Sequence, residues 1–165
     1  MTILVSDTSV LIDLERGSLL EPVFGLSATF GVPDLLYERE LKDHGGPGLL
    51  ALGLKVLELN GDEVILSQHY RSLARHISLP DSFALALATR SDHKLLTGDK
   101  ALRILAESKG VPCHGVLWVV DQLIEAKTVH KVILAAKLEQ IAAHPGCRLP
   151  RREVKLRVDR LLGRN

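Results

Sequence analysis

Two aspartates follow short apolar runs that we expect to be strands of one sheet. Asp7 comes directly after the run Ile3–Ser6, and Asp99 comes shortly after the run Lys94–Leu96. In an open parallel sheet, binding and catalytic groups collect outside the carboxyl ends of the strands. We therefore expect Asp7 and Asp99 to share one rim of the sheet. Taken alone, Asp7 is better explained as a helix cap and Asp99 is also explained as a turn residue, so the case depends on their shared position.

Two further segments bring acids to the same rim. Asp81 lies in the first turn of a helix that precedes the strand Lys94–Leu96 and must run antiparallel to it. The helix after the second strand starts near Pro33 and carries Glu38 and Glu40. On a helix these two glutamates lie about 200° apart, so only one of them can face the rim. Either Glu38 or Glu40 can therefore be the acid at the rim, and the helix pattern alone leaves both open.

Carboxylates that crowd together repel one another unless a positive charge neutralises them. Mg²⁺ binds to a few carboxylates while it keeps several waters, and Mn²⁺ suits the same ligands. A metal held in this way lowers the pKa of a bound water and stabilises the charge on a phosphodiester during in-line displacement. The four acidic segments therefore favour metal-dependent hydrolysis of a phosphodiester.

The elements that would position these acids alternate between strand and helix. Such alternation predicts a central parallel sheet with helices on both faces, a three-layer α/β fold. We expect one domain over residues 1–165, with a core over about 1–115 and a helical C-terminal extension over about 116–165. The strands are expected at residues 3–6, 28–32, 55–59, 94–96 and 111–114, and the extension is expected to contain helices at 116–126, 129–144 and 151–162.

Composition places few further limits on the function. The 165 residues are 46% hydrophobic, carry a net charge of +1 and include two cysteines, without zinc-type spacing. No apolar run is long enough to span a membrane, and no signal peptide is apparent, so we expect a cytoplasmic protein. Six basic and two acidic residues follow position 150, which makes this tail +4 and the rest −3. The tail is either a guide for a polyanion or a solvated amphipathic helix.

Four stretches resemble the motifs of the PIN domain family, in the order in which that family carries them. Residues 3–12 (ILVSDTSVLI) resemble its opening strand, aspartate and helix, and residues 32–38 (VPDLLYE) resemble its second motif. Residues 79–88 (LPDSFALALA) and 95–102 (LLTGDKAL) resemble the third and fourth motifs, which are the most specific pair. The resemblance extends over roughly the first 115 residues.

This resemblance implies a ribonuclease that hydrolyses RNA with Mg²⁺ or Mn²⁺, often the VapC-like toxin of a toxin–antitoxin pair. It implies that Asp7, Glu38, Asp81 and Asp99 are catalytic, that Asp7, Asp81 and Asp99 bind the metal, and that Thr97 supports them. RNA is then the substrate and an antitoxin protein is an expected partner. Exposed apolar positions on the C-terminal helices favour a homodimer.

The main alternative is a non-catalytic PIN-like domain that binds RNA or a protein. A haloacid-dehalogenase-like phosphatase is disfavoured because Ser9 stands where its second aspartate would be, and a receiver domain is disfavoured because Lys100 follows an acid rather than a strand. The helices after residue 115 exceed the compact toxin pattern. We interpret Trp118 as a core or oligomer residue rather than a platform on which bases stack.

Overall fold

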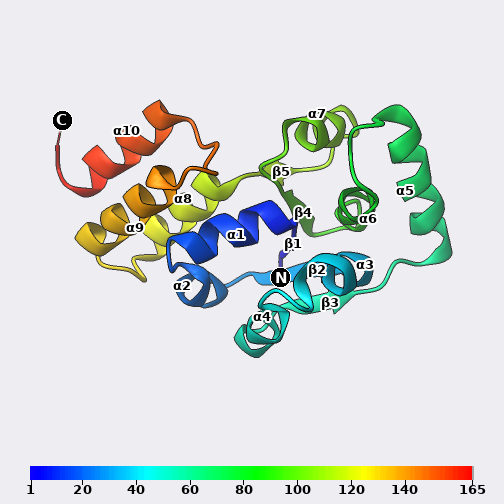
Figure 1. Ribbon diagram of the computed structural model, residues 1–165, viewed down its shortest axis with the longest axis horizontal. Coiled ribbons are helices and arrows are strands. Elements are labelled where there is room, and N and C mark those ends of the chain that lie inside the picture. The colour runs from blue at the N-terminus through cyan, green and yellow to red at the C-terminus, as the bar shows by residue number, and fades with distance from the viewer. Residues whose placement is uncertain (165) are drawn as a thin grey trace.

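A five-stranded parallel sheet forms the centre of the computed structural model, which describes residues 1–164 (Figure 1). The strand order is β3-β2-β1-β4-β5, so that β1 lies in the middle with β2 and β4 as its neighbours. Every pair of neighbouring strands is parallel. The strands are β1 Ile3–Ser6, β2 Thr29–Pro33, β3 Lys55–Leu57, β4 His93–Leu96 and β5 Cys113–His114.

The connections between the strands are largely helical. The first half of the chain contains α1 Thr8–Arg16, α2 Leu20–Phe24, α3 Asp34–Leu36, the π-helical turn η1 Tyr37–Leu41, α4 Gly46–Leu52 and α5 Gly61–Leu73. The second half contains α6 Leu79–Leu87, α7 Lys100–Ser108, α8 Val116–Ala126, α9 Lys131–Ala143 and α10 Arg151–Leu161. None of the helices within residues 1–164 is long and apolar enough to cross a membrane.

Successive residues of the central strands point to opposite faces of the sheet and build two separate cores. Leu4 and Leu96 join the core that packs against α1, α2 and α8, whereas Val5 and Leu95 join the core formed with α5, α6 and α7. Figure 1 shows the sheet between these two groups of helices. The structure therefore confirms the expected three-layer α/β fold with a parallel sheet.

The C-terminal helices share the first of these cores rather than standing apart from it. Buried residues of α8, α9 and α10 pack in the same cluster as Val10 and Leu14 of α1. The approach of α9 to α1 is so close that a Cβ atom on Gly17 would lie 2.6 Å from the Ile141 side chain. The Arg157 guanidinium of α10 makes two hydrogen bonds of 2.8 Å to Asp121 of α8. Residues 116–164 thus form part of the packed body.

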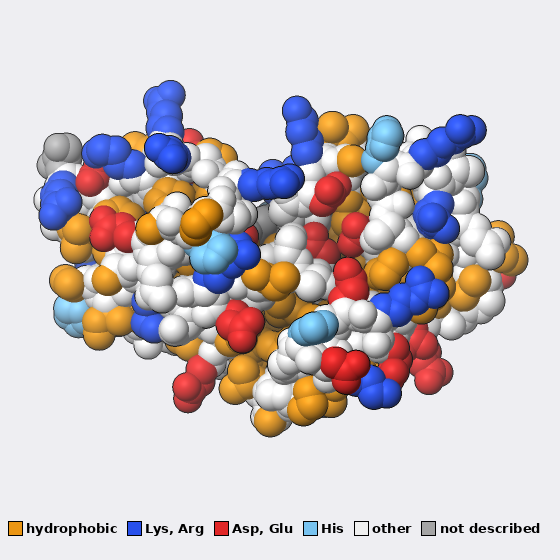
Figure 2. Space-filling model, in the orientation of Figure 1, with side chains coloured by type: hydrophobic (Ala, Val, Ile, Leu, Met, Phe, Trp, Pro, Cys, Tyr) orange, Lys and Arg blue, Asp and Glu red, His pale blue; other side chains and the backbone are white. Residues whose placement is uncertain are grey.

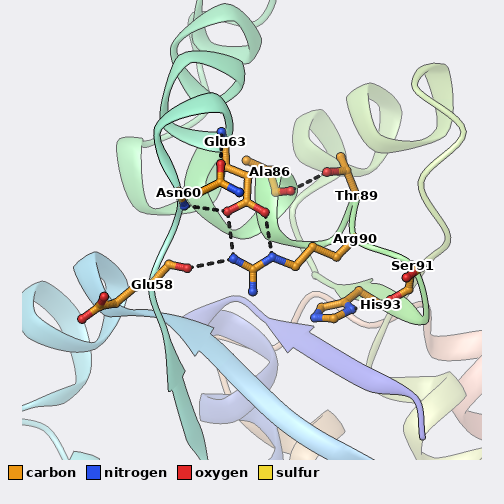
Figure 3. Close-up of polar contacts among 8 residues, drawn as sticks. All are labelled: Glu58, Asn60, Glu63, Ala86, Thr89, Arg90, Ser91 and His93. Carbon is orange, nitrogen blue, oxygen red and sulfur yellow. Dashed lines mark hydrogen bonds and ion pairs between the residues drawn. The ribbon is translucent and has the colours of Figure 1, made fainter.

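An ion pair near the end of α6 connects this helix, whose first turn contains Asp81, to α5. Arg90, just beyond its end, donates to both carboxylate oxygens of Glu63 over 2.7 and 2.8 Å and to the Glu58 carbonyl over 2.8 Å (Figure 3). The Glu63 carboxylate also accepts from the Asn60 backbone N–H and completes the capping box of α5. This bidentate ion pair therefore connects the segment just after α6 to the start of α5.

Three local features differ from what the sequence pattern predicts, namely a loop over residues 45–48, strands over 55–59 and 111–114, and a capping box formed by Ser78 and Asp81. The glycine-rich segment 45–48 is not a free loop, because α4 begins at Gly46 with Pro47 in its first turn. Two strands are shorter than expected, because β3 ends at Leu57 instead of residue 59 and β5 begins at Cys113 instead of residue 111. Ser78 caps α6 by accepting from the Asp81 N–H over 3.1 Å, but the only full capping box within residues 1–164 belongs to α5.

Candidate active site

Asp7 lies at the carboxyl end of the central strand and is almost fully buried, with 3% of its surface exposed. One carboxylate oxygen caps α1 by accepting from the Val10 N–H over 3.0 Å and also accepts from the Ser9 hydroxyl over 2.8 Å. The other oxygen accepts from the buried Thr97 hydroxyl. Burial raises the pKa of Asp7, and these hydrogen bonds oppose the increase because they favour the charged form. The carboxylate is consequently held in one orientation.

Thr97 connects Asp7 to the neighbouring strand end. Its hydroxyl donates to Asp7 and accepts from the Asp99 backbone N–H over 2.9 Å. Asp99 is exposed and caps α7, accepting from the Leu102 N–H over 2.7 Å. The ends of β1 and β4 thus place Asp7 and Asp99 at one rim, as expected from a parallel sheet.

Asp81 occupies the third position of α6 and is partly buried beside the other acids. Burial is the largest cause that raises its pKa, to about 6, and the negative charges of Asp7, Glu40 and Asp99 raise it further. A hydrogen bond with Ser78 acts in the opposite direction. The negative charge of Asp81 is therefore unfavourable in the folded protein. This is the usual result when a carboxylate is partly buried and lies close to other carboxylates.

The fourth acid that lines the groove is Glu40, whereas the family resemblance implied Glu38. Glu40 lines the same groove as the aspartates and accepts from the Thr8 hydroxyl over 3.1 Å. Glu38 lies outside the groove and forms an ion pair of 2.8 Å with Lys42 on the surface. The segment is a π-turn, closed by a hydrogen bond of 2.8 Å from the Lys42 N–H to the Tyr37 carbonyl. Such turns often occur at functional sites.

The acids lie at one end of a groove of about 990 Å³. From there the groove runs past Ile12 and Asp13 of α1 towards the loop between α9 and α10. Its remaining wall contains the acid Glu153 and a larger set of basic and aromatic side chains, namely Arg16, Lys100, Arg103, His114, Trp118 and Arg148. Figure 2 shows acidic side chains in a hollow near the middle of the molecule and basic side chains along its rim. The groove therefore combines an acidic end with a basic border.

The donor set at the acidic end consists of carboxylate and hydroxyl oxygens, which are ligands for hard divalent cations. Within residues 1–164, however, no three His, Cys, Asp or Glu side chains lie close enough together to form a ready-made ion site. This arrangement still fits Mg²⁺, because Mg²⁺ commonly takes one or two carboxylates and fills its other positions with water. Asp7, Asp81 and Asp99 are the residues able to supply those carboxylates.

Several groove residues were missed in the sequence or assigned another role. Trp118 was expected in the core or at an oligomer contact, but it lines the groove and is only partly buried. Arg103 and Arg148 carried no recognisable motif, since their positions depend on how distant helices pack. The only available sequence signal for Arg148 was a basic residue within a Gly- and Pro-containing connection between two helices.

The chain belongs to the PIN domain family, because a sequence model of that family matches residues 3–161. This match continues through the C-terminal helices, well beyond the roughly 115 residues that carry the recognisable motifs. No curated protein matches the chain. PIN domains are in general nucleases.

Proposed function

From the premise that this chain is a PIN domain, we propose that it is a divalent-metal-dependent endoribonuclease that hydrolyses RNA phosphodiester bonds. The observation that carries the proposal is the convergence of Asp7, Glu40, Asp81 and Asp99 at one end of a single groove. These acids come from four separate segments. Burial, and after it the charges of the other acids, raise the pKa of Asp81, and a bound cation would offset both costs of its negative charge.

In this proposal Asp7, Asp81 and Asp99 would hold Mg²⁺ or Mn²⁺. When bound, the ion supplies a water of lowered pKa and a positive charge for the phosphate oxygens. Asp7 contributes a carboxylate whose orientation is set in advance by Thr97 and the start of α1. Such fixed ligands need no rearrangement during the reaction, which is the usual source of electrostatic catalysis.

Glu40 has a separate role in the same proposal. Its carboxylate borders the space shared by the three aspartates and is held by Thr8 at 3.1 Å. A carboxylate at that place can orient the attacking water and accept its proton, provided that it lies within hydrogen-bond reach of the water. We therefore assign Glu40, and not Glu38, to this role.

The experiment is cleavage of a labelled RNA by purified protein with Mg²⁺ or Mn²⁺, with excess chelator, and with metal restored after chelation. We expect cleavage only with free metal, and products with a 5′-phosphate and a 3′-hydroxyl, because water is the nucleophile. An Asp81→Asn variant purified in the same way controls for contaminating ribonuclease and should be inactive. Full activity in chelator, or cyclic phosphate ends, would contradict the proposal.

A non-catalytic RNA-binding module is the second candidate. This candidate is favoured because, within residues 1–164, no three acidic side chains lie close enough together to coordinate one ion. This candidate predicts RNA binding without cleavage under every metal condition, together with no change in melting temperature on addition of Mn²⁺. The cleavage experiment above, repeated with a thermal denaturation series in Mn²⁺, separates the two candidates.

A further inference from the structure

The groove continues well beyond the four acids, and its second half has a different chemistry. Its wall there is formed by the segment from Cys113 to Trp118, by Arg103 of α7 and by the loop that contains Arg148. These parts come from the end of β5, the first turn of α8 and the connection between α9 and α10. None of them takes part in the proposed hydrolysis, so this half of the groove needs its own explanation.

Two aromatic rings in this half are stacked on each other. His114 and Trp118 have ring centroids 4.2 Å apart and planes inclined by 11°, and both rings line the groove. Lys94 lies with its Nζ atom 5.5 Å from the centroid of the Trp118 ring. Burial, followed by the charges of Lys94 and Arg103, lowers the pKa of His114 and so favours its neutral form. The pair offers a flat, polarisable surface next to positive charge.

Two cations flank this pair, and neither has a carboxylate partner within residues 1–164. The Arg103 guanidinium donates to the Thr97 carbonyl over 3.2 Å and lies against Gly115, where an added Cβ would come within 3.0 Å of it. Arg148 is exposed on the opposite loop. Since Arg103 contacts the strand end that carries Thr97, the positive charge adjoins the acidic end directly.

The basic tail makes a different use of its charges. Arg157 and Lys155 are engaged in ion pairs with Asp121 and Asp159, and neither lines the groove. Arg152 is exposed on α10 and also lies outside the groove. The sequence left the tail as either a guide for a polyanion or a solvated helix, and the basic residue near the C-terminus that lines the groove is Arg148, in the loop before the tail. Arg152 thus provides a matched control for Arg148.

We propose that this half of the groove is a nucleotide subsite in which the His114–Trp118 pair stacks on an unpaired base while Arg103 and Arg148 bind the adjoining phosphates. This subsite depends on the proposed function in one respect only, namely that it lies beside the phosphodiester bond that the acids would cleave. Aromatic rings can reach the face of a base only when that base is free of a duplex. The substrate class is therefore single-stranded RNA or an unpaired loop, and duplex RNA is excluded from this subsite.

The experiment measures binding without cleavage, using the full chain with the Asp81→Asn change. Three labelled oligonucleotides of equal length are compared by fluorescence anisotropy: a single-stranded RNA, the same strand in a duplex, and a strand that lacks its bases. Base stacking predicts that the single strand binds about fivefold to about a hundredfold more tightly than the other two. Trp118 is the only tryptophan, so its emission should change with the single strand alone.

The same binding measurements on variants that also carry Asp81→Asn then show which side chains contact the RNA. Trp118→Ala should weaken binding of the single strand by about fivefold to about a hundredfold and leave the strand without bases unaffected. Arg148→Gln should weaken both strands and lower the salt slope of binding by about 0.7. Arg152→Gln should change neither quantity. The comparison of strands with and without bases needs no change at Trp118, so it remains decisive if Trp118→Ala fails to fold.

Equal affinity for strands with and without bases would overturn the subsite, as would base-dependent binding that leaves Trp118 emission unchanged. Tight binding of the duplex at the same site would overturn the assignment of substrate class. These results are distinct from the failure of the proposed function, because a protein that binds single strands as described but never cleaves RNA would retain the subsite and lose the nuclease activity.

Discussion

Replacement of Asp81 by asparagine should stabilise the metal-free protein, although it removes an expected metal ligand. The Asp81 carboxyl is partly buried and faces Asp7, Glu40 and Asp99, so its pKa is about 6 instead of 3.8. A raised pKa means that the folded state binds the proton more tightly than the unfolded state does. Ionisation of Asp81 therefore destabilises the fold, and stability falls as pH rises between these two values.

The size of this effect follows from the two pKa values. A tenfold change in proton affinity is worth about 1.4 kcal/mol, so the charged carboxylate costs the folded state at most about 3 kcal/mol at pH 8. The same charge gains about 0.3–1 kcal/mol from its place in the first turn of α6, and asparagine forgoes that gain. After a further reduction for solvent screening, Asp81→Asn should raise the free energy of unfolding by about 1–2 kcal/mol.

The assay is urea denaturation of wild type and Asp81→Asn in chelator at pH 8 and pH 4.5. The gain at pH 8 should shrink to about a third at pH 4.5, because the wild-type carboxyl is then largely protonated. Asp62→Asn is the control, since Asp62 is also an acid in the first helical turn, here of α5, but is exposed and outside the groove. A loss of stability in Asp81→Asn, or an equal gain at both pH values, would refute this reasoning.

Three further predictions concern stability and pH. Asp7→Ala should be less stable than Asp7→Asn by about 2 kcal/mol in thermal denaturation, because only asparagine can still accept from the Val10 N–H; equal stability would show that the cap is unimportant. Glu63→Gln should lose about 1.5–3 kcal/mol at pH 7, since the ion pair with Arg90 lowers the Glu63 pKa. That deficit should vanish as pH falls well below 4.5, and a constant deficit would contradict it. RNA cleavage at limiting Mn²⁺ should fall as pH drops through about 6, and more Mn²⁺ should move the midpoint lower; a midpoint independent of Mn²⁺ would exclude this competition.

The sequence was sufficient for the parts of the site that follow from strand order. Asp7 and Asp99 directly follow the strands or turns that place them, and a parallel sheet brings such positions to one rim whatever the details of packing. Asp81 could be predicted for the same reason, because a helix that precedes a parallel strand begins at that rim. These three placements depend on topology, which alternating strand and helix patterns reveal well.

The choice between Glu38 and Glu40 could not be made in this way. It depends on a single π-turn over Tyr37–Leu41, which changes which side of the helix faces the groove. The second half of the groove could not be predicted from the sequence either. It depends on packing between α1 and α9, two helices that lie far apart in the chain. Gly17 packs closely against Ile141, and Gly146 in the Arg148 loop lies against the Arg16 guanidinium, and neither contact has a periodic signal in the sequence.

The most direct test of the nuclease site is the rate of RNA cleavage by Glu40→Gln and Glu38→Gln, measured side by side in Mn²⁺ with wild type. The two changes are chemically identical and lie two residues apart, but only Glu40 borders the groove with the aspartates. We expect Glu40→Gln to lose about 100-fold or more of the rate, the usual range for a positioned proton acceptor, while Glu38→Gln stays close to wild type. An active Glu40→Gln beside an inactive Glu38→Gln, or no cleavage by wild type, would contradict the proposed site.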